Sequence, residues 1–63
     1  MPIVNVTLVR GRDLADVQEF CRQVTKAAEQ HLHVRPKAVR VFVTEVEPEL
    51  FFVAGKSKAE LSA

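Results

Sequence analysis

Three residues of this 63-residue chain could do chemistry, namely Pro2, Arg12 and Arg40. Methionine is usually removed when the second residue is as small as proline, and its removal would leave a secondary amine on a rigid ring. A terminal α-amine has a pKa of about 8, which apolar surroundings and the two cations would lower further. The neutral amine could then act as a general base, although proline at position 2 is common and usually has no function.

The two arginines could bind a carboxylate. Arg40 lies in an apolar stretch between Val39 and Val41. On a solvated strand face it would be an ordinary surface cation, but on a face covered by another subunit it would require an anionic partner. Arg12 taken alone is an ordinary turn cation. Guanidinium groups bind carboxylates in a bidentate manner, so arginines from adjacent subunits could hold a small dicarboxylate.

Cysteine and histidine chemistry finds little support in the sequence. Cys21 falls on the apolar side of an expected helix, which is typical of a small core residue. His31 and His33 are two positions apart and therefore point to different sides of a helix, with no third ligand for a metal. No third group would orient a Cys/His nucleophile pair either. We expect no metal and no cofactor.

Four segments must position these residues. Val, Ile, Thr and Leu dominate residues 3–9, which predicts a strand. Apolar residues at three- and four-residue steps predict a long amphipathic helix over about 14–32, with Asp13 as its N-cap. Alternation over 38–46 predicts a second strand. The apolar run 50–54 predicts a short strand or a hairpin arm.

A strand, a long helix and a second strand imply a right-handed crossover between parallel strands. The predicted fold class is therefore α/β (α+β), a β-α-β subunit with a short C-terminal hairpin. One helix can cover one sheet face, and the other face, carrying Arg40 and Phe42, would stay open. A chain of this size is marginal alone, and its single cysteine cannot form an internal disulfide. We expect an oligomer in which the sheet continues across a twofold axis.

Composition excludes several classes of protein. The net charge of +1 gives no electrostatic footprint for nucleic acid or anionic lipid. No apolar run approaches the roughly 20 residues that a membrane span requires, and the N-terminus lacks the pattern of a signal peptide. One cysteine fits a reducing cytoplasm. We expect one domain over residues 1–63 and a cytoplasmic location.

Taken together, these features resemble the 4-oxalocrotonate tautomerase family of the tautomerase superfamily, over nearly the whole chain. The resemblance rests on short motifs at the spacings of that family: Pro2-Ile3-Val4, Gly11-Arg12, Val39-Arg40-Val41, Thr44-Glu45, and Phe51 four residues before Gly55. It implies dimers with a four-stranded sheet, a homohexamer built from three dimers, and a place in the breakdown of aromatic compounds.

The resemblance also implies a role for each site residue. Pro2 would be the catalytic base, shuttling a proton between the 2-hydroxyl of a dienol acid and a distant carbon to give the conjugated ketone. Arg12 would hold the far carboxylate, and Arg40 of another subunit the carboxylate and carbonyl at the near end. Phe51 would form a hydrophobic wall that also keeps the pKa of the amine low.

The sequence departs from the family pattern in its hairpin and at Arg10. Residues 52–55 are poorer in glycine than the usual hairpin, and Phe52 could take the wall position instead of Phe51. Arg10 adds a cation where the best-known members have an acid, which could alter the preferred substrate charge. Catalysis also requires loss of Met1, because the Pro2 nitrogen is otherwise an amide without basicity.

Two other functions stay open at this point. A superfamily relative could hydrate, dehalogenate or decarboxylate a short unsaturated or keto acid, with water activated by Glu45, Glu47 or Glu49. Alternatively, the chain could be a non-catalytic scaffold or one subunit of a hetero-oligomer whose partner supplies the active proline.

Overall fold

A computed structural model describes residues 1–62, and Ala63, the last residue of the expected domain, lies outside the described residues. The elements in chain order are β1 (Ile3–Val9), α1 (Leu14–Leu32), the 3-10 turn η1 (Pro36–Ala38), β2 (Arg40–Val46), the 3-10 turn η2 (Pro48–Leu50), β3 (Phe52–Val53), β4 (Lys56–Ser57) and α2 (Lys58–Ser62). The predictions of the first strand and of the long helix are confirmed. The predicted start of the second strand at residue 38 is wrong, because Pro36 begins a 3-10 turn there.

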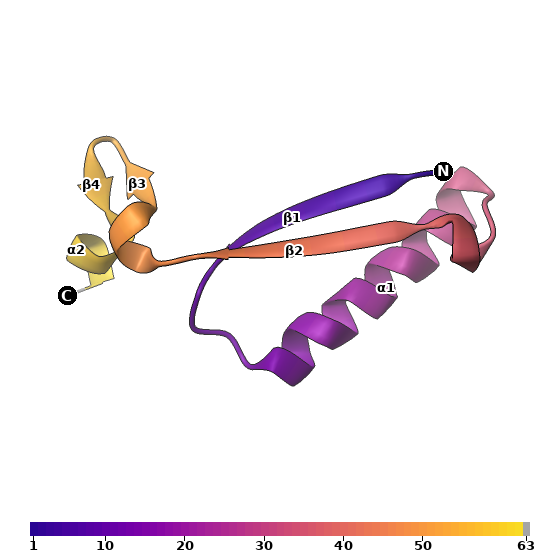
Figure 1. Cartoon of the computed structure of the whole chain (residues 1–63), viewed down its shortest axis with the longest axis horizontal. Helices are drawn as coiled ribbons and strands as arrows, with labels where there is room; N and C mark the ends of the chain where they lie inside the picture. Colours follow the sequence, from indigo (N-terminus) through magenta and orange to yellow (C-terminus); the bar gives the residue numbers. More distant parts are fainter. Residues whose placement is uncertain (63) are drawn as a thin grey trace.

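The two long strands pair in parallel, and α1 crosses from the end of one to the start of the other (Figure 1). The register runs from Ile3 opposite Arg40 to Val9 opposite Val46. This arrangement confirms the predicted β-α-β unit. Side chains on the face toward α1 are half-buried at Val4, Val6, Leu8, Val41 and Val43, whereas Ile3 and Phe42 on the other face are 56% and 54% exposed.

The ends of α1 are formed by the main chain. Asp13 is the N-cap of α1, as predicted, and has extended backbone, but its side chain makes no capping hydrogen bond. Its carbonyl accepts from the N–H groups of Asp16 and Val17, each at 3.1 Å. The helix ends at Leu32, and its C-cap His33 has a left-handed backbone with φ 56°.

The chain buries few apolar side chains. Among the described residues, only Ala28 (7% exposed) and Val39 (9%) are buried hydrophobics, and no large side chain is fully buried. The radius of gyration is 14.7 Å, against about 11 Å for a compact domain of this length. A single subunit therefore has little hydrophobic core of its own.

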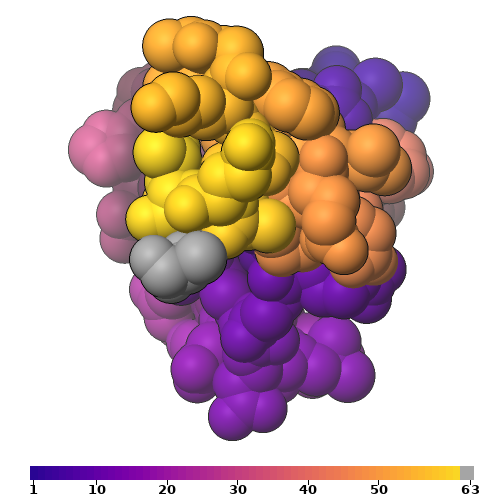
Figure 2. All heavy atoms as spheres, turned by 90° about the vertical axis from the view of Figure 1, so that its left-hand side faces the viewer, coloured from indigo at the N-terminus to yellow at the C-terminus, as the bar shows by residue number. Residues whose placement is uncertain are grey.

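A small C-terminal arm extends beyond the end of β2. Strands β3 and β4 pair antiparallel, with Phe52 opposite Ser57, and confirm the expected hairpin, although its first strand starts at residue 52. The turn uses Ala54 (φ 52°) and Gly55 (φ 79°), as a two-residue primed turn requires. Figure 2 looks onto this arm, whose orange and yellow atoms form the near end of the molecule.

No helix within residues 1–62 combines the length and the apolar character needed to cross a lipid bilayer.

The arm is closed by a capping box at the start of α2. The Ser57 N–H donates to the Glu60 carboxylate at 2.6 Å, and the Glu60 N–H donates to Ser57 Oγ at 3.2 Å. The Lys58 N–H donates to the Phe51 carbonyl at 2.7 Å, which joins α2 to the segment after η2. The hydrogen bond from the Ser57 backbone, followed by that with its side chain, lowers the pKa of Glu60 below its usual value of 4.5.

This capping box predicts a pH dependence of stability. Because the folded-state pKa of Glu60 is lowered, its stabilising effect is present above the unfolded pKa and is lost as the pH falls through the folded pKa. Glu60→Gln should therefore show a smaller loss of stability between about pH 6 and pH 3 than the unmodified chain. Ser57→Ala should lower the free energy of unfolding by about 0.5–2 kcal/mol at neutral pH. Urea unfolding measures both effects, and parallel pH profiles for Glu60→Gln and the parent would contradict the first.

Candidate active site

Pro2 and Arg40 lie at the same end of the sheet but belong to opposite faces. The Arg40 N–H donates to the Pro2 carbonyl at 3.0 Å. Ile3 and Arg40 are register partners and both are exposed on the open face, whereas Pro2 precedes Ile3 and is half-buried. Since successive residues of a strand point to opposite faces, one chain does not direct the Pro2 ring and the Arg40 side chain at a common ligand.

Arg12 and Phe51 lie at the far end of the sheet from Pro2. Arg12 follows β1, and Phe51 follows β2 and η2. A strand of seven residues such as β1 spans about 20 Å. Figure 1 shows the N-terminus and the C-terminal arm at opposite ends of the molecule. A single chain therefore divides the four predicted site residues between two ends.

Arg12 lines two hollows near the start of α1. The first is largely apolar and is lined by Leu8, Arg12, Asp16, Val17 and Phe20. The second is more polar and is lined by Arg10, Gly11, Arg12, Leu14, Val17, Val43 and Glu45. Pro2, Arg40 and Phe51 line neither of them. Within one subunit, Arg12 thus borders both of these concave surfaces.

The two candidate arginines differ from Arg10 in their partners. Within residues 1–62, neither Arg12 nor Arg40 pairs with a carboxylate, whereas Arg10 pairs with Glu45 and Glu47. Arg40 Nη1 donates to the carbonyls of Lys37 at 2.6 Å and Val39 at 3.4 Å. Because both contacts are made through Nη1, the Nε–Nη2 edge of Arg40 can still receive a carboxylate.

The two aromatic candidates of the arm differ in burial. Phe51 is half-buried, and its carbonyl is held by the Lys58 N–H. Phe52 lies in β3 and is 59% exposed. Both residues are held by main-chain contacts of the arm, and the side chain of Phe51 is the more buried of the two.

The state of the Pro2 nitrogen depends on Met1. While Met1 is attached, the nitrogen belongs to an amide. Met1 is 79% exposed, so no packing of the subunit holds it in place. Its removal would leave a secondary amine just before β1.

The cysteine and the two histidines do not form a cluster that could bind a metal. Cys21 is half-buried on α1, and His31 and His33 are exposed at its end. Among residues 1–62, no three His, Cys, Asp or Glu side chains come together as a metal-binding group.

Comparison with known proteins now identifies the family. A family model described as "Tautomerase enzyme" matches residues 2–61. The chain belongs to the tautomerase family. A probable tautomerase of Staphylococcus aureus (strain Mu50) is 35% identical over 60 residues, covering 95% of this chain and 98% of the relative. This membership confirms the resemblance seen in the sequence motifs.

Solved tautomerase structures share the fold. TomN, a 4-oxalocrotonate tautomerase homologue in the tomaymycin biosynthetic pathway, superposes with a TM-score of 0.94 and 41% identity, covering 97% of this chain and 94% of TomN. A heterohexamer 4-oxalocrotonate tautomerase from Chloroflexus aurantiacus J-10-fl superposes with a TM-score of 0.92 and 33% identity, covering 97% and 98% of the two chains. The oligomeric state of that relative shows that this subunit fold occurs in assemblies.

The turn that carries Arg12 depends on Gly11. Its φ is +132°, and a Cβ built there would meet no atom within 4 Å. The cost of a side chain is therefore conformational and not steric, and we expect Gly11→Ala to destabilise the fold by about 1–3 kcal/mol. Urea unfolding measures the change.

The matched control is Ala54→Gly, which makes the reverse exchange at another turn residue with positive φ. It should preserve or raise stability, because it relieves a left-handed alanine. Equal stability of Gly11→Ala and the parent would contradict the conformational role of Gly11.

Proposed function

We propose that the chain is a cofactor-free tautomerase that interconverts the enol and keto forms of 2-hydroxydienoates or related α-keto acids. The observation that carries the proposal is the family match over residues 2–61. The matched segment contains Pro2 just before β1, and it contains two arginines, Arg12 and Arg40, without a carboxylate partner among the described residues.

In this proposal, the Pro2 amine is the proton carrier. After loss of Met1, the neutral amine accepts the proton of the substrate 2-hydroxyl and becomes a cation as the hydroxyl oxygen becomes the carbonyl. It then returns the proton to a distant carbon of the conjugated chain, so the reaction is a net isomerisation with no other reactant. Arg12 binds the far carboxylate, and Arg40 binds the near carboxylate and the carbonyl oxygen. Phe51 supplies an apolar wall that favours the neutral amine.

Pro2 and Arg40 lie on opposite faces at one end of the sheet, and Arg12 and Phe51 lie at its other end. This separation supports an active site shared by several subunits. A twofold axis across the sheet edge would place two subunits antiparallel, so that the Pro2 end of one lies beside the Arg12 and Phe51 end of the other. Contacts on the open sheet face would bring Arg40 from another dimer. We propose a hexamer of three dimers, with the open face and the exposed apolar arm buried between subunits. The heterohexamer from Chloroflexus aurantiacus supports an assembly of this size.

The contacts of Arg10 and the Chloroflexus relative bear on the two alternative functions, a hydratase or decarboxylase and a subunit of a hetero-oligomer. Glu45 and Glu47 both accept hydrogen bonds from Arg10, which argues against their use in activating water for a hydratase or decarboxylase. A hetero-oligomer is favoured by the Chloroflexus relative, and in that case a partner chain would provide the active proline. Intact mass separates the cases, because a subunit that supplies the amine must lose Met1.

The direct test is the Pro2→Ala variant. We expect its rate of ketonisation of 2-hydroxymuconate to fall by about 10²–10⁴-fold, the usual contribution of a general base, and we expect the active parent protein to lack Met1 by mass spectrometry. Unchanged activity in Pro2→Ala, or full activity in a protein that retains Met1, would overturn the proposed mechanism.

The arginine roles are tested with a matched set of variants. Arg12→Ala and Arg40→Ala should each raise KM for the same substrate by about tenfold or more, since each removes a charge-assisted contact to a carboxylate. Arg22→Ala is the control, because Arg22 lies on α1 and pairs with Glu19 at 3.2 Å. An equal effect of all three substitutions would show a general charge effect and contradict specific binding.

A further inference from the structure

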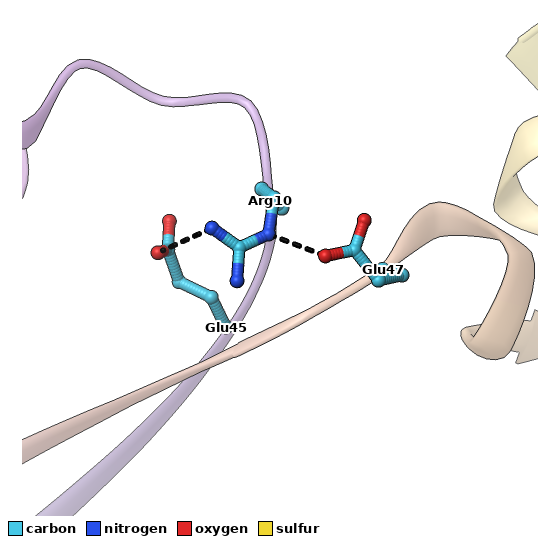
Figure 3. Close-up of polar contacts among 3 residues, drawn as sticks. All are labelled: Arg10, Glu45 and Glu47. Atoms are coloured by element: carbon cyan, nitrogen blue, oxygen red, sulfur yellow. Dashed lines mark hydrogen bonds and ion pairs between the residues drawn. The ribbon is translucent and has the colours of Figure 1, made fainter.

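Arg10 stands between two carboxylates at the end of the sheet (Figure 3). Arg10 Nε donates to Glu47 Oε1 at 2.5 Å, and Nη1 donates to Glu45 Oε1 at 3.5 Å. The Arg10 N–H also donates to the Val46 carbonyl at 2.9 Å. Main chain and side chain together fasten the residue after β1 to the end of β2.

These contacts join the two segments that lead to Arg12 and Phe51. Arg12 is two residues beyond Arg10, across the Gly11 turn, and Phe51 is four residues beyond Glu47, across η2. The turn itself follows the last pair of the strand ladder. The Arg10 contacts therefore lie where the Arg12 and Phe51 segments leave the sheet.

We propose that Arg10, Glu45 and Glu47 form a positioning clasp that holds Arg12 and the Phe51 segment in place for the far end of the substrate. This inference rests on the proposed function. Arg10 is a positioning residue in this account and not an additional cation for the substrate.

The charges of the clasp favour positioning over direct binding. One guanidinium faces two carboxylates, so the three side chains carry a net charge of −1 and offer no attraction to an anionic ligand. The side chains of Arg10 and Glu47 are 55% and 50% exposed, and pairs this exposed contribute little to global stability. The expected effect of breaking the clasp is therefore local, on binding at Arg12.

The experiment compares Arg10→Ala, Glu47→Ala and the double variant in the full chain, with 2-hydroxymuconate as substrate. Each single variant should raise KM about fivefold with kcat changed by less than about twofold, and the double variant should resemble the single ones, because all three break the same contact. Exchange of the pair, Arg10→Glu with Glu47→Arg, should restore part of the binding.

The sign of the Glu47→Ala effect separates positioning from simple electrostatics. Removing a carboxylate near a dianionic substrate would by charge alone lower KM, whereas loss of positioning raises it. Glu49→Ala is the matched control, since it removes the same charge from an exposed residue of η2 that lies two residues farther on. An unchanged or lowered KM in Glu47→Ala, or an equal rise in Glu49→Ala, would overturn the clasp.

A second readout separates failure of the clasp from failure of the proposed function. In backbone amide NMR spectra, Glu47→Ala should shift the Gly11 and Arg12 signals, and Glu49→Ala should leave them in place. If the parent protein lacks tautomerase activity, the proposed function fails and the NMR comparison still decides the clasp. Unmoved Gly11 and Arg12 signals in Glu47→Ala would overturn it.

Discussion

The parallel pairing of β1 with β2 is the constraint on which the rest of the structure depends. The register sets Ile3 opposite Arg40 and so puts Arg40 on the open face. The direction of the strands puts Pro2 at one end and the Arg12 turn at the other (Figure 1). With a single helix to cover it, the sheet keeps one face exposed. Separation of the candidate site residues and exposure of apolar surface thus have the same structural origin.

That common origin links folding to the proposed function. A subunit with only two buried hydrophobic residues in its described part would gain stability mainly by covering its open face and its arm with other copies, as proposed. The same contacts would bring Pro2 of one subunit to Arg12, Phe51 and Arg40 of others. In such an assembly, the association of subunits would bury the hydrophobic core and complete the active site at the same time. The Arg10 clasp would hold the conformation of the Arg12 turn before the subunits associate.

Much of the subunit could be predicted from the sequence, because its long elements have strong periodic patterns. Residues 3–9 and 14–32 match the predicted strand and helix, and the motifs around Pro2 and Arg40 correctly indicated the family. The start of β2 was missed because alternation continues into the 3-10 turn at Pro36. Asp13 is the N-cap that its residue type predicts, but residue type alone does not reveal that its side chain makes no capping hydrogen bond.

The contacts of Arg10 could not be foreseen from the sequence. Glu47 lies 37 residues away, and the pair meets only because of the register of two strands and the continuation of the ladder by the Arg10 N–H. Sequence patterns also cannot predict how the candidate site residues would come together, because this depends on how several copies of the chain pack.

An active site shared between subunits can be tested by subunit complementation. Pro2→Ala and Arg40→Ala chains are co-expressed, purified as a mixed assembly and assayed at substrate well below KM, where each variant alone should keep about a tenth of the parent activity or less. If Pro2 and Arg40 of one site come from different chains, random mixing restores both native residues at roughly a quarter of the sites, and a matching fraction of the parent activity returns. If both residues of a site come from one chain, every site in the mixture stays defective. Activity no higher than that of the separate variants would contradict the account.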